Sequence, residues 1–281
     1  GMAPLDALMH MFSTVSLGGL SSHDQSFGHF QSPLLEAICI VFMLVASCNF
    51  ALYFVAIRKG HWHGFWHDPE LRATLFTLVG GGLLVAVLLW VKGVYAPLDA
   101  LRHGMFNLVS LASTTGYATV DYLAWPVFAP VFMLLLSGVA TSAGSTGCGI
   151  KMVRMLILLK QARREMNRLV HPRAVQPVRL GDAVVDNRVI FSVLAFMLVY
   201  GATIFGLSMV LLLTDLDPVT AFSAVLASVN CAGPGLGAVG PASNFAVLTD
   251  FQIWVCTLAM LLGRLEILSF MALLTPAFWR R

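Results

Sequence analysis

The chain has 281 residues, of which 58% are hydrophobic and only 11% are charged. Its mean hydropathy of +0.82 excludes a soluble globular protein and indicates an all-α polytopic membrane protein. The formal net charge of +3 says little by itself, whereas the positions of the positive residues along the chain are informative.

The first element is a short apolar segment that begins with Pro4-Leu5-Asp6-Ala7-Leu8 and ends in the glycine turn Ser16-Leu17-Gly18-Gly19. A long apolar run from Pro33 to Ile57 follows, and it ends at the basic pair Arg58-Lys59. The sequence therefore predicts a helix that enters the membrane without crossing it (a half-span), a turn, and a helix that crosses the membrane (a span). We assign them to a first unit, residues 1–59.

A second unit repeats this pattern. An uncharged run from Thr74 to Val91 leads to Pro97-Leu98-Asp99-Ala100-Leu101, which matches the opening of the first segment letter for letter. The segment ends in the turn Ser113-Thr114-Thr115-Gly116. A helix over Ala100 to Ala112 is about 20 Å long, too short to cross about 30 Å of hydrocarbon. We therefore expect the chain to enter the membrane and turn back here, so that the turn lines a pore.

A run of small residues interrupts the next apolar segment. The run from Leu123 onwards is broken between Ser137 and Gly149, and it continues as the basic helix Ile150 to Arg168. Each glycine in a helix interior costs about 1 kcal/mol relative to alanine, so a break is expected. The break is either a kink at a close contact between helices or a flexible loop that plugs the pore. We assign residues 60–168 to this second unit.

A third, weaker copy of the half-span and turn lies in the last part of the chain, residues 187–281. The uncharged span Val189 to Thr214 leads to a segment that begins at Asp217-Pro218 and ends in the turn Asn230-Cys231-Ala232-Gly233. The last span runs from Thr249 to Trp279. The sequence therefore predicts five spans and three half-spans.

The positive residues lie in a few segments. Fourteen of the 17 Lys and Arg residues fall within 58–72, within 151–188 and at the two C-terminal arginines. Because basic residues accumulate in cytoplasmic loops, we expect these segments, the linker 169–186 and the C-terminus to be cytoplasmic. The tract from Lys151 to Arg168 either only follows this rule or also forms a docking surface for a cytosolic partner.

The turns offer oxygen atoms to an ion that has lost its water. Backbone carbonyls replace water where the residues allow tight or left-handed geometry, which the glycine at the end of each turn provides. Such cages suit hard monovalent cations better than anions or organic solutes. Half-helices that point their C-termini at one place add the negative ends of their dipoles. Further oxygens come from the hydroxyl groups of Ser16, Ser113, Thr114 and Thr115.

Several motifs together resemble one family: STTGYATVDY, SAGSTGCGIKMVR, HPRAVQPVRL, NCAGPGLGAVGP and LLGRLEIL. In this order they are similar to the TrkH/TrkG branch of the Trk/Ktr/HKT superfamily of potassium-uptake proteins, and the resemblance runs from Pro4 to the C-terminus. It implies repeated units of span, pore loop and span around a pseudo-fourfold pore, with one key glycine in each loop. Those glycines would be Gly116, Gly233 and either Gly19 or Gly18.

The resemblance also implies where the transported ion binds. The selectivity filter would consist of the twelve residues of the three turns, and potassium would bind at Thr114, Thr115, Cys231 and Ala232. The family's first repeat and its pore loop have no counterpart before Pro4. We therefore expect an N-terminally truncated chain, a fragment or one half of a split pair, because three quadrants do not close a pore.

The broken helix and an arginine form the predicted gate. The resemblance implies an intramembrane gating loop, in which Cys148 stands where the family commonly has glycine. Arg264 would lie well inside the last span, where an arginine costs about 2.5 to 3.5 kcal/mol and needs a partner. It either pairs with Glu266 or caps a helix, or it faces the ion path and contacts carbonyls of the gating loop. The gate residues would be Gly138, Gly144, Ser145, Thr146, Gly147, Gly149 and Arg264.

The cysteines and histidines give little indication of a metal site or a catalytic site. The five cysteines have no CxxC spacing and are interpreted as packing residues. A metal site at the histidines of residues 61–67 is indicated only weakly, because no carboxylate or cysteine other than Asp68 and Glu70 completes a ligand set. The chain also has no HExxH or GxSxG motif and few acids within its spans, so an intramembrane hydrolase is not expected.

The predicted function is potassium uptake across the bacterial cytoplasmic (inner) membrane, with the potassium ion as cargo and no organic cofactor. The resemblance implies a homodimer that contacts membrane lipid and a cytosolic nucleotide-binding regulatory subunit of the TrkA type; no nucleic acid is expected. The alternatives are a sodium-permeable cation channel and a non-conducting structural or regulatory membrane fragment.

Overall fold

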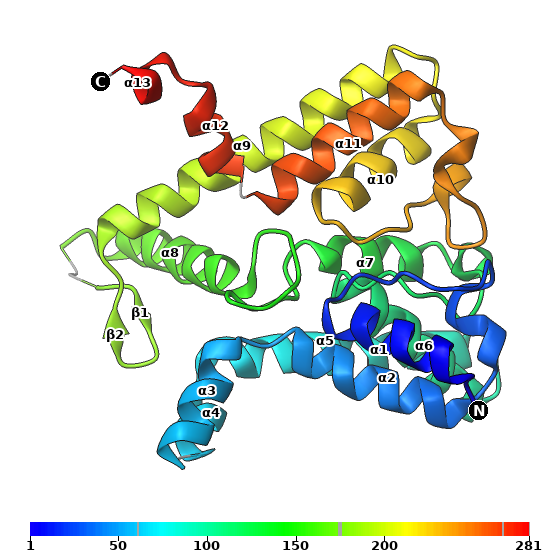
Figure 1. Ribbon diagram of the computed structural model, residues 1–281. Coiled ribbons are helices and arrows are strands. Elements are labelled where there is room, and N and C mark those ends of the chain that lie inside the picture. The colour runs from blue at the N-terminus through cyan, green and yellow to red at the C-terminus, as the bar shows by residue number, and fades with distance from the viewer. Residues whose placement is uncertain (61, 174–175, 266, 281) are drawn as a thin grey trace.

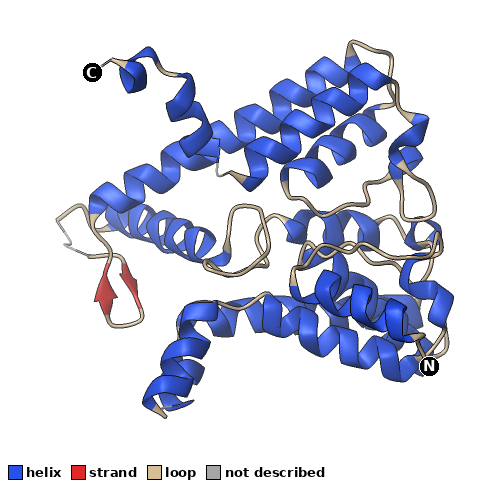
Figure 2. Ribbon diagram, in the orientation of Figure 1, coloured by secondary structure: helices blue, strands red, loops and turns tan. Residues whose placement is uncertain are grey.

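The computed structural model describes residues 1–60, 62–173, 176–265 and 267–280. In this part of the chain the β-structure is limited to a small antiparallel hairpin, β1 (Arg179–Leu180) and β2 (Ala183–Val184), and helices make up the rest of the regular structure (Figure 2). The predicted all-α fold class is therefore confirmed.

Short helices precede each predicted turn. They are α1 (Pro4–Val15), α6 (Pro97–Ala112) and α10 (Pro218–Val229). Each begins with a proline, which fits the first position of a helix because its missing N–H has no partner to lose there. At 1.5 Å per residue α1 and α10 are about 18 Å long and α6 about 24 Å. All three are shorter than the hydrocarbon core, as expected for half-spans.

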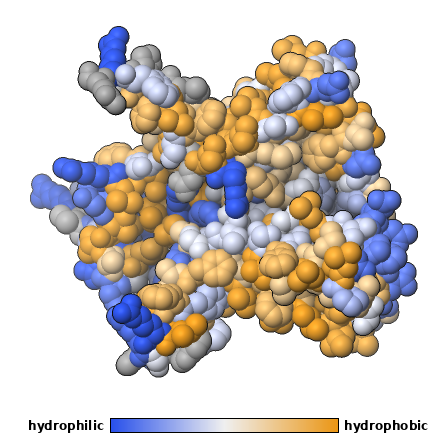
Figure 3. All heavy atoms as spheres, viewed as in Figure 1, coloured by the Kyte–Doolittle hydropathy of each residue, from blue (hydrophilic) through white to orange (hydrophobic). Residues whose placement is uncertain are grey.

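Among the described residues, two helices are long and apolar enough to cross a membrane, α5 (Pro69–Val91) and α9 (Asn187–Leu212). One face of α9 exposes Phe191, Leu198 and Phe205, which are seven residues apart and so lie on one stripe of the helix. Figure 3 shows hydrophobic residues over most of the visible face and hydrophilic residues gathered mainly at its left and right edges. Such a surface suits a bilayer.

The structure corrects two predicted spans. The run from Pro33 to Ile57 is not one helix, because α2 (Pro33–Ala46) and α3 (Phe50–Lys59) meet at an angle of 87°. The cause is the polar sequence between them, in which the side chain of Asn49 caps α3 by accepting the N–H of Ala51 at 2.9 Å.

The last predicted span, Thr249 to Trp279, is also broken. Its first part is α11 (Asp250–Arg264), which is followed after a bend of 104° by α12 (Ile267–Leu274). The predicted interruption between Ser137 and Gly149 is present, since α7 (Phe128–Ser137) ends there and α8 (Met152–Val170) begins beyond it.

The remaining elements are short. They are α4 (Trp62–His67), α13 (Pro276–Trp279) and the 3-10 helices η1 (Ser26–Phe30), η2 (Tyr122–Ala124), η3 (Gly237–Val239) and η4 (Phe245–Val247).

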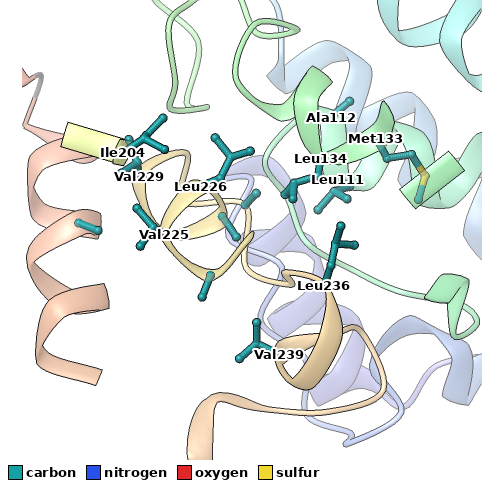
Figure 4. Close-up of a cluster of buried hydrophobic side chains, with 14 of the residues drawn as sticks. Leu111, Ala112, Met133, Leu134, Ile204, Val225, Leu226, Val229, Leu236 and Val239 are labelled. Carbon is teal, nitrogen blue, oxygen red and sulfur yellow. The ribbon is translucent and has the colours of Figure 1, made fainter. Parts of the chain in front are cut away.

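The helices form two groups that meet at α7. In Figure 1, α1, α2, α5 and α6 lie in the lower part, and α9, α10 and α11 lie in the upper part. Helix α7 contacts both α6 and α10. Leu111, Leu134 and Val225 belong to the buried cluster between these three helices (Figure 4). The hydrophobic core therefore joins the C-terminal ends of two half-helices, which fixes the turns that follow them.

Candidate functional site

The three predicted turns share one backbone conformation. We call Ser16–Gly19 the first turn, Ser113–Gly116 the second turn and Asn230–Gly233 the third turn. In each turn the second residue and the final glycine have left-handed backbone angles. The φ values are +52° and +63° for Leu17 and Gly19, +65° and +90° for Thr114 and Gly116, and +52° and +86° for Cys231 and Gly233.

Hydrogen bonds close the turns in the same way. The N–H of the third residue donates to the carbonyl five residues before it, at 2.8 to 2.9 Å in all three turns. The donors and acceptors are Gly18 and Ser13, Thr115 and Ser110, and Ala232 and Ala227. Gly18 is therefore the counterpart of Thr115 and Ala232. The first-turn equivalent of Gly116 and Gly233 is Gly19.

The turns lie directly against one another. A Cβ atom added at Gly19 would overlap the carbonyl oxygen of Thr115, and one added at Gly116 would lie 2.5 Å from the carbonyl oxygen of Ala232. One added at Gly233 would lie 3.8 Å from the Cα atom of Gly116. The glycines of the first two turns thus face the third-position carbonyl of the following turn, and only a residue without a side chain fits there.

Buried hydroxyl groups support the second turn. Ser113 Oγ and Thr115 Oγ1 are 2.7 Å apart and share a hydrogen bond. Ser110 Oγ donates to the carbonyl of Tyr117 at 2.7 Å, which ties the chain after the turn back to α6. The hydroxyls of the second turn therefore hold the backbone in place.

A buried chain of side chains supports the third turn. Tyr200 on α9 donates its hydroxyl to Asn230 Oδ1 at 2.6 Å, and Asn230 Nδ2 donates to Ser137 Oγ at 2.9 Å. This chain joins the turn to α9 and α7. The sequence analysis did not identify Tyr200, because a tyrosine in an apolar span shows no distinctive spacing.

The segment between α7 and α8, residues 138–151, is called the broken segment here. It lies against the end of α1 and the second turn, because Thr146 Oγ1 donates to the carbonyl of Val15 at 3.3 Å and the N–H of Cys148 donates to Thr114 Oγ1 at 3.4 Å. A hydrogen bond joins its two ends, since the N–H of Ile150 donates to the carbonyl of Gly138 at 2.6 Å. The predicted gate residues between Gly138 and Gly149 therefore lie in one folded-back segment beside the second turn.

Helix α5 holds the broken segment. The carboxylate of the buried Glu70 accepts the N–H of Ala143 at 2.5 Å and that of Val153 at 3.3 Å. One turn further along α5, Thr74 shares a hydrogen bond of 2.9 Å with Ser142. The sequence analysis considered Glu70 only as a possible metal ligand. The predicted span began only at Thr74, whereas α5 begins at Pro69, so the role of Glu70 as a structural partner was not predicted.

The break between α2 and α3 also contacts this segment. The N–H of Ser142 donates to the carbonyl of Ser47 at 3.0 Å, and the N–H of Phe50 donates to the carbonyl of Gly144 at 3.2 Å. Each break therefore supplies hydrogen-bond partners to the backbone of the other, which lipid does not provide.

Arg264 contacts the broken segment. Its Nη1 atom donates to the carbonyl of Thr146 at 2.9 Å and lies 3.4 Å from Cys148 Sγ. Sequence analysis placed this arginine inside a continuous span, whereas it is the last residue of α11 and lies at the bend. Glu266, its alternative partner, lies outside the described residues. A cavity of 340 Å³ lies beside this contact, lined among others by Arg264, Cys148 and Tyr200.

The described residues contain no group of three or more His, Cys, Asp or Glu residues that could hold a metal ion. His63 and His67 stack on each other with ring centres 3.9 Å apart, and His61 lies outside the described residues. The five cysteines are free thiols.

Comparisons with known proteins by family model, by sequence and by structure all match one family. A family model described as TrkH, cation transport protein, matches residues 2–280. The chain is 42% identical over 283 residues to the Trk system potassium uptake protein TrkH of Vibrio parahaemolyticus, and 39% identical over 282 residues to TrkG of Escherichia coli. All of this chain is matched, and it spans 58% and 57% of the length of these two relatives.

A solved structure, the crystal structure of the potassium transporter TrkH from Vibrio parahaemolyticus, matches with a TM-score of 0.94 and 41% identity. The match covers 100% of this chain and 60% of that chain. The fold of this chain therefore matches that solved structure over the whole length of the chain. The chain belongs to the TrkH family of cation transport proteins.

Proposed function

We propose that this chain forms part of a potassium-conducting path across the membrane, in which the three turns bind the dehydrated ion through backbone oxygens. The observation that carries the proposal is the repeated turn geometry: the same left-handed positions and the same closing hydrogen bonds occur three times, in turns that touch one another. The residues at which we place the ion are Thr114, Thr115, Cys231 and Ala232.

Two further features favour a cation at this place. The turns directly follow the C-terminal ends of α1, α6 and α10, so the negative ends of three helix dipoles meet there. Potassium, as opposed to another cation, is suggested by the names of the relatives, which this chain matches over 57 to 58% of their length.

We also propose that the broken segment and Arg264 form the gate. The segment lies against the end of α1 and the second turn and has glycine at its bends, and Arg264 donates to one of its carbonyls. Movement of this segment would open or close the path beside the turns.

We also propose which membrane holds the chain and which proteins it contacts. The amphipathic, basic helix α8 with its exposed Leu159 and Leu169 suits a cytoplasmic docking surface for a regulatory subunit, in a homodimer in the bacterial inner membrane. The C-terminus would then also be cytoplasmic.

Uptake of radioactive rubidium into liposomes tests the proposal, with this chain reconstituted as part of a complete pore, because its three turns alone do not close one. We expect uptake that potassium outside the liposomes competes away and that sodium does not. Equal competition by sodium would instead indicate a sodium-permeable channel. No uptake above that of empty liposomes would overturn the proposal and favour a non-conducting membrane protein.

A further inference from the structure

The first residue of the third turn differs from its counterparts in where its side chain bonds. Ser16 Oγ and Ser113 Oγ each donate, at 3.2 Å, to the carbonyl three residues earlier in their own half-helix. Asn230 instead bonds to Tyr200 on α9, at 2.6 Å, and to Ser137 at the end of α7, at 2.9 Å. The side chain at the start of the third turn therefore joins this turn to two other helices.

These three side chains are closed off from solvent. Asn230 and Ser137 are 0% exposed, and Tyr200 is 6% exposed. Ser137 Oγ also donates to the carbonyl of Leu134 at 2.6 Å, so both hydrogen-bonding roles of this hydroxyl are used. A buried polar group that loses its partner has no water to replace it, so each bond restrains the position of the next side chain.

The chain of hydrogen bonds touches the start of the broken segment. A Cβ atom added at Gly138 would lie 3.4 Å from the hydroxyl oxygen of Tyr200 and 3.5 Å from Asn230 Nδ2. Both side chains thus pack against the backbone of Gly138. The carbonyl of this glycine accepts the N–H of Ile150, so the contact lies where the two ends of the broken segment are joined.

The helix after the broken segment also contacts this part of α9. The guanidinium carbon of Arg154, in the first turn of α8, lies 4.1 Å from the centre of the Phe196 ring, a cation–π contact. Phe196 stacks on Tyr200, with ring centres 5.9 Å apart and an angle of 25° between the ring planes. Tyr200 is therefore held from both sides of the broken segment.

We propose that Tyr200 is a positioning residue for cation selectivity. Through Asn230 it fixes the third turn relative to α7 and α9, which keeps the carbonyl oxygens of Cys231 and Ala232 at the spacing that a dehydrated potassium ion requires. A turn released from this restraint can close around the smaller sodium ion, so the preference for potassium falls. This role rests on the proposed function, in which those carbonyls bind the ion.

Rubidium uptake into liposomes, with the chain reconstituted as part of a complete pore, tests this role. The measured quantity is the ratio of the sodium and potassium concentrations that halve uptake. Tyr200→Phe keeps the ring and removes the hydroxyl, so the buried Asn230 Oδ1 loses its donor. We expect the ratio to fall about tenfold, which is the size of effect of one buried hydrogen bond.

Tyr122→Phe is the matched control. The hydroxyl of Tyr122 is also buried, but it has no hydrogen-bond partner among the described residues, so its removal keeps the ratio of the unsubstituted chain. Ser137→Ala removes the acceptor at the other end of the chain of hydrogen bonds, and we expect the same fall in the ratio. Combined with Tyr200→Phe it adds little, because both substitutions release the same side chain.

The possible failures can be told apart. An unchanged ratio in Tyr200→Phe overturns the proposal even if uptake is slower, because a merely structural role lowers the rate for all cations alike. For a variant without uptake, thermal unfolding in potassium and in sodium gives the comparison, since the preferred ion raises the unfolding midpoint more. We expect the difference between the two midpoints to shrink, and an unchanged difference overturns the proposal. Absence of uptake by the unsubstituted chain contradicts the proposed function, and this inference falls with it.

Discussion

Gly116 is fixed as glycine by two separate constraints. Its φ of +90° disfavours every L-amino acid with a side chain, and a Cβ atom there would lie 2.5 Å from the carbonyl oxygen of Ala232. The same two constraints apply at Gly19 with respect to Thr115. The glycines are therefore needed for the turns to pack together, whether or not an ion is bound.

Substitution of Gly116 tests this packing. We expect Gly116→Ala to destabilise the protein by about 1 to 3 kcal/mol, because the alanine is strained and overpacked. Rubidium uptake should fall with it, since the carbonyl of Ala232 must move. Gly201→Ala is the control, because Gly201 lies in α9 with open space around it. Thermal unfolding in detergent and rubidium uptake measure the two effects, and equal behaviour of both variants would contradict the explanation.

Arg264 is expected to hold the broken segment closed. Arg264→Ala removes the hydrogen bond to the carbonyl of Thr146, and a loss of about 1 to 2 kcal/mol corresponds to a rise of about 5- to 30-fold in rubidium uptake. Arg58→Ala, at an arginine that lies over the ring of Phe54, serves as the control. Uptake that stays unchanged in Arg264→Ala would rule out its role in the gate.

At the scale of elements, the breaks in the helices support one another. The broken segment donates backbone N–H groups to Glu70 on α5 and to the carbonyl of Ser47 in the gap between α2 and α3, and it shares a hydrogen bond with Thr74 on α5. Irregular backbone inside a membrane needs such partners. This explains why a buried glutamate lies in the first turn of a span.

Removal of the Glu70 carboxylate should loosen the broken segment. In Glu70→Ala the N–H groups of Ala143 and Val153 lose their acceptor, and we expect a cost of about 1 to 3 kcal/mol. The exposed Glu165 on α8 offers the comparison, since its side chain is 50% exposed and accepts no backbone N–H from the described residues. Thermal unfolding of the two variants gives the answer, and an equal shift for both would refute this role of Glu70.

An ion pair joins α2 to α6. Arg102 donates through two nitrogen atoms to the carboxylate of Glu36, at 2.6 and 2.7 Å, and the glutamate side chain is only 3% exposed. We expect Arg102→Leu to cost about 3 to 5 kcal/mol, because it leaves a buried charge without a partner.

The double variant Glu36→Leu with Arg102→Leu removes both charges, and we expect it to be more stable than Arg102→Leu alone. Thermal unfolding of the two proteins measures the difference. If the double variant is the less stable one, the cost of Arg102→Leu does not come from an unpaired carboxylate.

Sequence patterns predicted the elements better than their bends. The interruption after Ser137 was visible because glycine and hydroxyl residues accumulate there. The bend after α2 was not, because Ser47-Cys48-Asn49 is a brief polar stretch in an apolar run and its effect depends on Ser142 and Gly144, which are far away in the chain. Hydrophobicity shows that a segment suits the membrane and does not show where its backbone turns.

For the whole molecule, the repeat and the unequal length of its copies were both visible in the sequence. The openings at Pro4 and Pro97 are identical, yet α1 has 12 residues and α6 has 16, so α6 is about one helical turn longer. The turns correspond through their backbone angles, which also decide between Gly18 and Gly19. Contacts between turns, such as that of Gly116 with Ala232, depend on the packing of separate helices and could not be derived from spacing.

The central claim is that backbone oxygens of the three turns jointly bind a dehydrated alkali cation. An anomalous difference map from crystals of the protein grown in rubidium tests it most directly. We predict a peak among the turns, next to the carbonyls of Thr115 and Ala232 and within about 3 Å of several backbone oxygens. Rubidium peaks that occur only elsewhere, with none at the turns, would contradict the account.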